Sequence, residues 1–407
     1  MKRECLAVGI ILLFIGTAIL PSSGQSIEKS SQSTSRGNWL YVGGSGPGNY
    51  TRIKDAVDNA SNGDTVFVYD DSSPYYENNI LINTSINLIG EDKNTTIIDG
   101  KGGGNETNVL RISADGVKVT SFTIRNCHMG YLDKGICIEG AVREHGNPNT
   151  VSNVNISENI FIYMSIAIYE TKTFGTIISR NIFKSSGFSN GLVDAMEGCF
   201  DSFLRVGIES LYAKNSTIVG NMILNADDAG ITFEHSHGLI EGNYISFGNE
   251  PTNQRGIDQF SSFVRIIGNT ITKVAVGIVG TSSFSIISQN DISACCAYGI
   301  LFARPSRFNI ITKNNISECE QYGIALYQSL FTVVKENNFI KNNISAFFLG
   351  SLGTRWVHNY WDDWMGIGPK RIPGLFVFPW VNWYDIVGIP YDNFDWHPAK
   401  EPYDIRG

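Results

Sequence analysis

The sequence predicts an all-β protein of the parallel β-helix type, in which short strands of successive coils stack into three long sheets. The first observation is a repeat of about 22–24 residues, Ile-Ile-x-x-Asn-x-Ile followed by Gly-Ile, that fills most of the chain. The second is composition, because 42 Gly and 37 Asn stand against only 17% charged residues. Gly and Asn are poor interior helix residues, and no repeat holds a stretch long enough for a helix. Helical bundles and helical solenoids are therefore excluded.

The first 24 residues are typical of a secretory signal peptide. Lys2 and Arg3 precede a 15-residue apolar run over residues 6–20, and small residues follow at 22–24. This run is shorter than the roughly 20 residues that span a bilayer, so we expect cleavage rather than retention as an anchor. Residues 25–38 are Ser-rich and predict a flexible linker. Nine Asn-x-Ser/Thr sequons agree with an exported glycoprotein. They begin at Asn49, Asn59, Asn83, Asn94, Asn105, Asn155, Asn215, Asn315 and Asn343.

The β-helix itself is expected over residues 39–354. Residues 50–60 predict a short amphipathic helix, which would cover the open N-terminal end of the solenoid. Residues 355–407 predict an irregular aromatic C-terminal cap, because the repeat fades there and six of the seven Trp follow residue 350. A platform that stacks against sugars is the alternative for this region. The six residues are Trp356, Trp361, Trp364, Trp380, Trp383 and Trp396.

Two independent markers define the coils. The Asn markers recur with steps of 22, 40, 22, 26, 21, 24, 23 and 22 residues, and the Gly markers with steps of 23, 26, 21, 22 and 24. Asn tolerates a left-handed backbone in a tight turn, and stacked Asn side chains can hydrogen-bond from coil to coil. We therefore expect an Asn ladder whose members occupy left-handed turns. The Asn markers are Asn159, Asn181, Asn221, Asn243, Asn269, Asn290, Asn314, Asn337 and Asn359. The Gly markers are Gly207, Gly230, Gly256, Gly277, Gly299 and Gly323.

A column five residues after the Asn markers is expected to point inward, because its members are mostly small or apolar. Cys295 and Cys319 belong to this column and should lie one above the other in neighbouring coils. In an exported protein a disulfide between them is one alternative, and two stacked buried thiols are the other. No Cys-x-x-Cys pair indicates a zinc site.

Several segments resemble a known group of proteins. The stretch from Tyr41 to Ile124 contains NYTRIKDAVDNASNGDTVFVY, INLIGEDKNTTIIDG and GVKVTSFTIRN, and the end of the chain contains NYWDDWMGIGPKRIPG. With the repeats, these segments resemble the right-handed parallel β-helix proteins of the pectin-lyase-like superfamily. Within it they are most similar to the NosD-like group, the carbohydrate-binding and sugar-hydrolysis (CASH) domains, of archaeal surface-protein type. The resemblance implies the right-handed fold for nearly the whole mature chain. It leaves the activity open, because the superfamily includes lyases, hydrolases, epimerases, binding modules and copper-assembly accessories.

Charged residues gather between residues 194 and 258 in a chain that is otherwise poor in them. The position two after each Gly marker places Glu209 and Asp258 in one column, two coils apart, or about 9–10 Å. That distance is near the upper limit for the carboxylate pair of an inverting glycosidase. The candidate catalytic residues are Glu209, Asp227, Asp228 and Asp258. The candidate substrate-binding residues are Asp194, Arg205, Glu234, His235 and Arg255.

Three interpretations of this charged region stay open: an ordinary solvated face, a glycan-binding groove and a catalytic groove. Known motifs do not favour catalysis. Asp227 and Asp228 precede His237 by about nine residues, whereas polygalacturonases place Gly-His-Gly about one coil after their Asp pair. The spacing from Arg304 to Arg307 does not match that of pectate lyases. Calcium could bind the carboxylates, although no loop has a calcium-specific pattern.

A copper site rests on the NosD-like resemblance and on the neighbouring Cys127, His128 and Met129, with Cys137 ten residues on. Thiolates and thioethers are the ligands that Cu(I) prefers. Only six Met and isolated His residues argue against a metal carrier. Cys127 also falls in the inward column, five residues after Phe122, which favours a core residue.

The expected function is a secreted or cell-surface monomer that binds polysaccharide or glycoprotein glycans along its side. A polysaccharide lyase or glycoside hydrolase, a NosD-like copper-assembly accessory and a purely structural envelope protein are the alternatives. A net charge of -8 and a pI near 5.3 argue against a nucleic-acid partner. No membrane span is expected after signal cleavage. No cofactor is certain from the sequence: calcium is the candidate, and copper is disfavoured.

Overall fold

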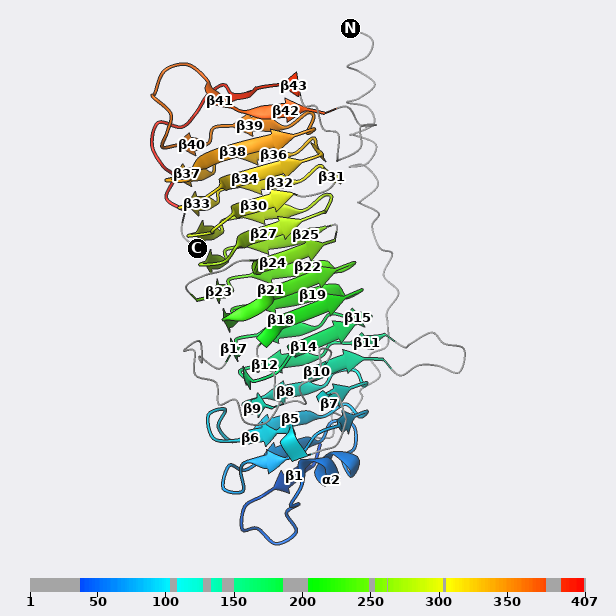
Figure 1. Cartoon of the computed structure of the whole chain (residues 1–407). Helices are drawn as coiled ribbons and strands as arrows, with labels where there is room; N and C mark the ends of the chain where they lie inside the picture. The colour runs from blue at the N-terminus through cyan, green and yellow to red at the C-terminus, as the bar shows by residue number, and fades with distance from the viewer. Residues whose placement is uncertain are drawn as a thin grey trace, which may run out of the picture. The chain divides into compact units, whose positions relative to one another are not determined.

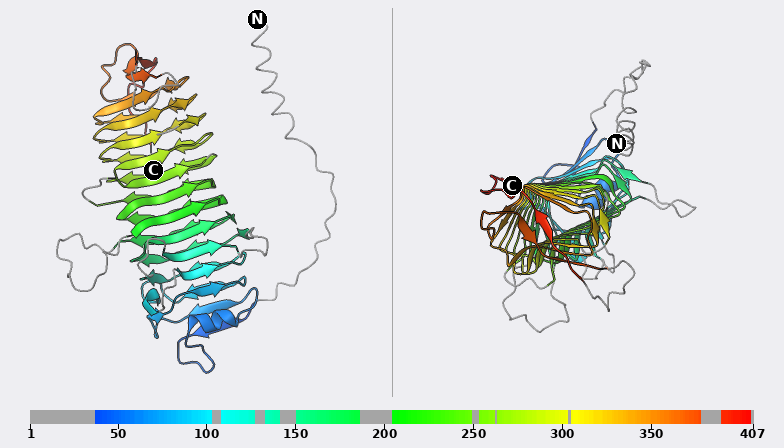
Figure 2. Two further views of the ribbon diagram at one scale, coloured as in Figure 1. Left: turned by 45° about the vertical axis from the view of Figure 1, so that its right-hand side comes forward. Right: turned by 90° about the horizontal axis from the view of Figure 1, so that it is seen from above.

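The computed structural model confirms the predicted all-β parallel β-helix (Figures 1 and 2). It describes residues 37–102, 108–126, 133–140, 150–185, 204–248, 253–261, 263–302, 305–377 and 389–405. The predicted signal peptide and residues 25–36 of the predicted linker lie outside these ranges. Within them, no helix is long and apolar enough to cross a membrane.

Successive coils contribute strands to three sheets, A, B and C, in which neighbouring strands are parallel except β41 with β44 and β42 with β43. Sheet A contains β1 (Trp39–Val42), β2 (Thr65–Val68), β5 (Asn87–Gly90), β8 (Lys118–Thr120), β11 (Val151–Ser152), β12 (Asn155–Ser157), β15 (Thr173–Phe174), β16 (Ile177–Ser179), β19 (Lys214–Val219), β22 (His237–Glu241), β25 (Val264–Ile267), β28 (Ile286–Ser288), β32 (Ile310–Thr312), β36 (Val333–Lys335), β39 (Arg355–Val357), β41 (Lys370–Ile372) and β44 (Asn393–Asp395). Sheet B contains β3 (Tyr75–Tyr76), β6 (Ile97–Asp99), β9 (Thr123–Arg125), β13 (Ile160–Ile162), β17 (Ile182–Lys184), β20 (Met222–Leu224), β23 (Tyr244–Ser246), β26 (Thr270–Thr272), β29 (Asp291–Ser293), β33 (Asn315–Ser317), β37 (Asn338–Ile340) and β40 (Tyr360–Trp361).

Sheet C contains β4 (Ile80–Ile82), β7 (Asn108–Ile112), β10 (Lys134–Glu139), β14 (Ile166–Thr171), β18 (Leu204–Leu211), β21 (Ala226–Glu234), β24 (Arg255–Phe260), β27 (Val276–Gly280), β30 (Tyr298–Phe302), β34 (Tyr322–Tyr327), β38 (Ile344–Leu349), β42 (Gly374–Phe376) and β43 (Ile389–Pro390). The remaining elements are α2 (Ile53–Asp58), η1 (Gly100–Gly102) and the small pair β31 (Ser306–Arg307) and β35 (Ser329–Leu330). Alternate residues of each strand point into one continuous core of Ile, Val and Phe.

The Gly markers lie on sheet C where successive coils approach most closely. A Cβ at any of the six Gly markers would lie 2.5–2.7 Å from a carbonyl oxygen of the next coil. Real Cβ atoms do not approach that closely, so these positions take Gly for steric reasons. The recurring Gly in the sequence therefore reports coil stacking.

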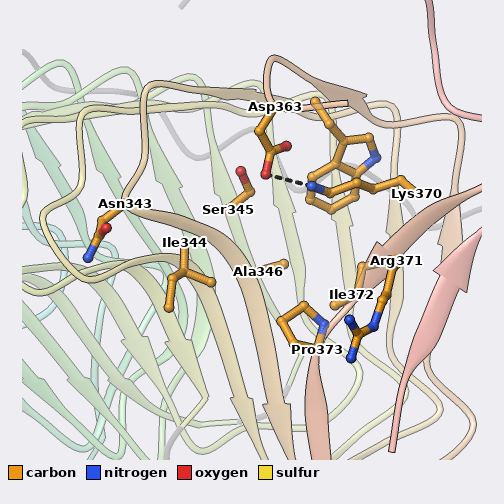
Figure 3. Close-up of a pocket in the computed structure, with 10 residues that line it drawn as sticks. Asn343, Ile344, Ser345, Ala346, Asp363, Lys370, Arg371, Ile372 and Pro373 are labelled. Carbon is orange, nitrogen blue, oxygen red and sulfur yellow. Dashed lines mark hydrogen bonds and ion pairs between the residues drawn. The ribbon is translucent and has the colours of Figure 1, made fainter. Parts of the chain in front are cut away.

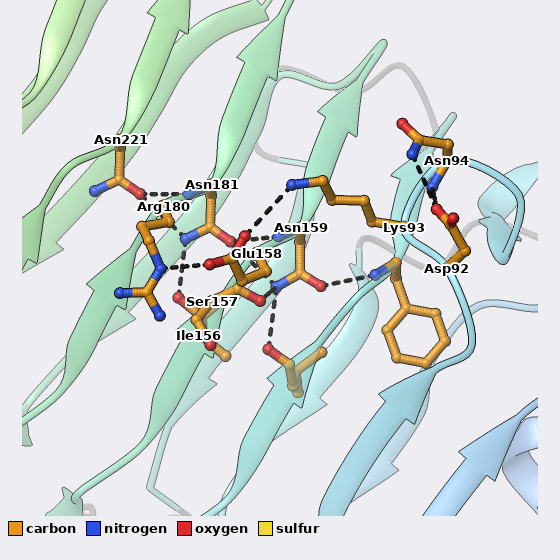
Figure 4. A network of polar contacts seen from close by, with 12 residues as sticks. Asp92, Lys93, Asn94, Ile156, Ser157, Glu158, Asn159, Arg180, Asn181 and Asn221 are labelled. Atoms are coloured by element: carbon orange, nitrogen blue, oxygen red, sulfur yellow. Dashed lines mark hydrogen bonds and ion pairs between the residues drawn. The ribbon is translucent and has the colours of Figure 1, made fainter.

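The Asn markers form a continuous buried ladder. Figure 4 shows the part of it made by Asn159, Asn181 and Asn221. From Asn159 to Asn337, each Nδ2 donates to the Oδ1 of the next Asn marker at 2.9–3.1 Å. The predicted ladder is confirmed, but the predicted left-handed backbone of the Asn residues is wrong. The left-handed residue is the one before each Asn, for example Glu158 at φ 59° and Arg180 at φ 53°. The Asn side chain itself points into the core, where its Nδ2 donates to backbone carbonyl oxygens and its Oδ1 accepts from a backbone N–H.

Polar groups close both ends of the solenoid. At the N-terminal end, Glu77 accepts hydrogen bonds from the backbone N–H of Ile53 (2.7 Å) and Lys54 (2.9 Å), the first residues of α2. This helix covers residues 53–58 and is shorter than the predicted 50–60. At the other end, buried Asp395 takes the place of a further Asn and accepts from the N–H and Nδ2 of Asn359 at 2.9 and 3.1 Å.

The Trp residues of the C-terminal region do not share one environment. Trp356 and Trp361 are 3% and 1% exposed and pack on the end of the core, as a cap requires. Trp364 packs against the same core, whereas Trp396 is 66% exposed. The predicted cap residues Trp380 and Trp383 lie outside the described residues.

The predicted inward column is largely inward, with Met164, Ala226 and Val274 buried. Cys295 and Cys319 are also buried, and both are free thiols. The hydrogen bond between the two thiols and the burial of Cys295 raise its pKa well above its usual value. This arrangement is the stacked-thiol alternative of the sequence analysis. Gly248 departs from the column, since it is exposed in a left-handed turn with φ 45°, and Ser186 lies outside the described residues.

Candidate functional site

The outer face of sheet C carries the predicted carboxylate column. Glu209 on β18 pairs in register with Thr232 on β21, and Thr232 pairs with Asp258 on β24, so the two carboxylates are two coils apart as expected. Their neighbours Ile208 and Ile257 are fully buried in the core. Because side chains alternate along a strand, Glu209 and Asp258 lie on the outer side of the sheet.

A β-bulge brings the other two candidate carboxylates to the same place. Between two matched pairs, β21 contains one more residue than β18, so Asp227 and Asp228 together lie opposite Arg205. A bulge of this kind re-aims side chains locally and is common beside functional sites. The extra residue turns Asp228 toward the arginines of both neighbouring coils.

Five side chains on three strands form one ion-paired group, which we call the charge cluster. Arg205 contacts Glu209 and Asp228, both at 3.3 Å. Arg255 pairs with Asp228 and, at 2.7 Å, with Asp258. Asp228 therefore lies between two guanidinium groups. The side chains of Arg205 and Arg255 are 20% and 33% exposed, so the cluster faces solvent without being fully open to it.

Burial shifts the carboxyl groups of this region toward neutral pH. It raises the pKa of Asp258 to about 6, against the opposing effect of Arg255. The Asp258 side chain is only 4% exposed, and within the described residues no hydrogen-bond donor reaches its Oδ1. Burial also raises the pKa of Glu209. Asp227 is an exposed residue, yet partial desolvation and the charge of Asp228 raise its pKa to about 6. Perturbed carboxyls of this kind are typical of functional sites.

Replacing Asp258 with Asn is expected to raise the free energy of unfolding at pH 7.5 by about 1–2 kcal/mol. The folded pKa of about 6 lies above the ordinary 3.8, so folding holds a proton that the unfolded chain has released. Wild-type stability should therefore fall as pH rises from about 4 to 6, and the Asn variant should lack that step. Urea unfolding at pH 4, 5, 6 and 7.5 measures it. Identical pH profiles for the two proteins would contradict the buried carboxyl.

The remaining candidate residues lie at the edge of the cluster or outside the described chain. Glu234 ends β21, and its charge contributes to the raised pKa of both Glu209 and Asp258. His235 is exposed in a left-handed turn and stacks on Tyr212, with ring centroids 5.0 Å apart. It belongs to the corner of the coil rather than to the cluster. Asp194 lies outside the described residues.

An aromatic section, which the sequence analysis missed, continues the same face toward the C-terminal end. Tyr298 and Tyr322 stack with centroids 5.6 Å apart, and Tyr322 meets Phe347 at 5.4 Å. The Tyr327 hydroxyl lies 3.5 Å from that of Tyr298, and burial raises the pKa of Tyr327. Tyr298, Tyr322, Tyr327 and Phe347 are all half-buried. A Tyr directly before two successive Gly markers was the sequence signal that could have revealed this section.

Strand register joins the two sections. Arg255 of the charge cluster lies in a column that continues through Val276, Tyr298 and Tyr322 to Ile344. The charge cluster and the aromatic section therefore form one continuous strip along sheet C.

No metal site can be assigned to this face. Among the residues that the structure describes, no three His, Cys, Asp or Glu side chains are grouped to hold a metal ion. Calcium at the carboxylates stays a prediction. Cys127, His128 and Met129 lie outside the described residues, and burial raises the pKa of Cys137 to about 12, which disfavours the thiolate that copper binding requires.

A family model described as a right-handed beta helix region matches residues 206–360. Among solved structures, the chain is similar to the A-module of mannuronan C-5 epimerase AlgE6 from Azotobacter vinelandii, with 13% identity and a TM-score of 0.59 over 76% of this chain and 89% of that one. It is also similar to the GH136 lacto-N-biosidase from Eubacterium ramulus, with 12% identity and a TM-score of 0.56 over 78% and 65%. The Dettilon tailspike protein matches with 13% identity and a TM-score of 0.55 over 79% and 66%.

At these identities the structural similarity shows the fold. A search of curated proteins finds no significant match. The right-handed β-helix is thus established for the chain, and its function has to be argued from the strip on sheet C.

Proposed function

We propose that this protein is exported and binds a polysaccharide or glycan along the outer face of sheet C. The observation that carries the proposal is the continuous strip that joins the charge cluster to the aromatic section. From β18 to β38 it crosses six inter-strand spacings, or about 29 Å at ~4.8 Å each. That length accommodates several sugar units in a row.

The chemistry of the strip suits a ligand that is rich in hydroxyl groups. Aromatic rings offer apolar surface to the C–H faces of sugars, and the Tyr hydroxyls remain at the edge for hydrogen bonds. The Arg–carboxylate pairs supply donors and acceptors that are already fixed in position, which lowers the entropic cost of binding. Two of the similar structures bear the names of carbohydrate enzymes, a mannuronan C-5 epimerase and a lacto-N-biosidase, and this supports the ligand class.

Export and glycosylation belong to the same proposal. The signal-like N-terminus supports export, and five sequon asparagines have exposed side chains on which a glycan could be carried. They are Asn59, Asn83, Asn94, Asn215 and Asn343.

A hydrolase or lyase is the second candidate, and the raised pKa values of Glu209 and Asp258 favour it. Carboxyls that titrate near neutral pH suit general acid and base roles. Against it, Asp258 is almost fully covered, whereas an inverting pair needs room for a water between its carboxyls. Binding is therefore the function that this geometry supports best.

Replacing Tyr322 with Ala is expected to weaken glycan binding about 5–30-fold, because the stack between Tyr298 and Phe347 is lost. The measurement is a panel of polysaccharides and defined oligosaccharides, scored for both affinity and cleavage. Tyr244→Ala is the matched control, since Tyr244 is 40% exposed on sheet B. Equal losses of glycan affinity in the two variants, or a panel in which no glycan binds, would contradict sheet C as the binding face. Cleavage products abolished by Glu209→Gln would favour the enzyme instead.

A further inference from the structure

A pocket lies where the column of Gly markers ends. The position that holds Gly in the preceding coils is Ser345 on β38. Within the described residues, the only part of β38 that pairs with β42 is Phe348 and Leu349, at the far end of the strand. The first half of β38 is therefore left without the strand that a further coil would add. A cavity of about 270 Å³ lies at this place. Figure 3 shows residues that line it.

The walls of the pocket combine charged, polar and apolar groups. Asp363 accepts a hydrogen bond from Nζ of Lys370 at 2.5 Å (Figure 3), and the same Nζ lies 5.7 Å from the ring centroid of Trp361. Ile344 and Pro373 supply apolar surface. The pocket therefore offers an ion-paired carboxylate and ammonium group beside an apolar wall.

Ser345 shows that this pocket is prepared for a polar ligand. The residue is only 4% exposed, and its Oγ has no hydrogen-bond partner among the described residues. A buried hydroxyl without a partner costs free energy that a ligand hydroxyl would restore. At the six Gly markers a Cβ would lie 2.5–2.7 Å from a carbonyl oxygen of the next coil, whereas among the described residues no strand of a further coil pairs with Ser345.

The pocket adjoins the strip on sheet C. Ile344, which lines it, is the last residue of the column that runs from Arg255 through Tyr298 and Tyr322. A ligand lying along the aromatic section therefore meets the pocket at its C-terminal end.

We propose that this pocket binds one neutral sugar unit, the terminal residue of a glycan. Its volume is just below the ~300–1,000 Å³ of sites for larger ligands, which suits a single ring. Asp363 is balanced by Lys370, and Arg371 beside them by Asp392 at 2.6 Å, so an uncharged ligand suits the pocket better than an ion. Ring hydroxyls would bridge the carboxylate, the ammonium and Ser345, while C–H groups meet the apolar wall. Only the course of the remaining glycan rests on the proposed function.

The test uses ligand-observed NMR with glucose, galactose, mannose and N-acetylglucosamine. The full chain is made without N-glycosylation, because Asn343-Ile344-Ser345 is itself a sequon. At least one of these sugars should bind, and Ser345→Gly and Lys370→Met should each weaken that binding at least about fivefold. The Gly variant restores the residue of the earlier coils, so it should fold normally. Lys313→Met is the matched control, since Lys313 is exposed at another corner and pairs with Glu336.

Two results would overturn the pocket: no sugar of the panel binds, or both pocket variants bind as the wild type does. The polysaccharide panel on the same proteins separates this failure from failure of the lateral face. If the protein binds polysaccharide but no monosaccharide, the pocket proposal is contradicted and the proposed binding along sheet C is not. Monosaccharide binding that depends on Ser345, without polysaccharide binding, supports the pocket and removes the face.

Discussion

Replacing Asn290 with Ala is expected to lower the free energy of unfolding by about 3–5 kcal/mol. Its Nδ2 donates to the carbonyls of Ile266 and Ser288, both at 3.0 Å, and to Oδ1 of Asn314 at 2.9 Å. Its Oδ1 accepts from the N–H and Nδ2 of Asn269, both at 2.9 Å. The side chain is fully buried, so water cannot replace these bonds. The substitution interrupts the ladder in the middle of the solenoid and leaves buried groups of two neighbouring coils without partners.

Urea unfolding followed by far-UV circular dichroism measures this loss. Asn315→Ala is the matched control, because it removes the same kind of amide directly after Asn314, the Asn marker of the next coil. Asn315 is half-buried on the outer face of sheet B, and its Nδ2 donates only to Asp291 at 2.9 Å. Its loss should cost about 1 kcal/mol or less. Similar losses for the two variants would show that the ladder contributes no more than a surface hydrogen bond.

Replacing Arg255 with Met is expected to weaken glycan binding at least about tenfold and to destabilise the protein by about 3 kcal/mol at pH 8. Arg255 is the cation in contact with the buried carboxylate of Asp258 and also holds Asp228. Its positive charge lowers the pKa of Asp258, so its removal should raise that pKa further above 6. The stability loss should therefore grow as pH rises from 5 to 8. The part of the loss that comes from Asp258 should vanish below about pH 4, where the folded wild type and the folded variant both hold Asp258 protonated.

Arg205→Met is the matched control for this second experiment. Arg205 contacts Glu209 and Asp228 on the same face but has no ion pair with Asp258. Its removal should change glycan affinity without the steep pH dependence. If the stability loss of Arg255→Met is the same at pH 5 and pH 8, as expected for Arg205→Met, the Arg255–Asp258 pair is not the cause of that loss.

The repeat made the fold and the Asn ladder predictable, because both markers recur at the coil length. The position of the left-handed residue was not predictable in the same way. That residue is Glu158 in one coil, Arg180 in the next and Gly220 in the one after. Several residue types adopt this left-handed conformation, so no single residue type recurs at the position. The amide of Asn, by contrast, is required in every coil of the ladder.

The candidate site was predictable in position but not in environment. Counting from the Gly markers placed Glu209 and Asp258 in one column, and strand register agrees. The low exposure of Asp258 and its ion pair with Arg255 depend on tertiary packing, and the bulge at Asp227 and Asp228 adds one residue within a strand. Neither is encoded in periodicity. The pocket at Ser345 was not predictable for a different reason. It lies where the first half of β38 has no neighbouring strand from a further coil among the described residues.

Asp395 determines where the stack of coils can stop. An Asn side chain both donates and accepts hydrogen bonds, so each Asn of the ladder can bond to a further Asn stacked on it. A carboxylate only accepts. Oδ2 of Asp395 accepts from Asn359 and from Nε1 of Trp361 at 3.2 Å, and its Oδ1 accepts from the backbone N–H of His358 and His397. Asp395 therefore ends the ladder of Asn side chains, because it has no amide N–H group that could donate to a further Asn.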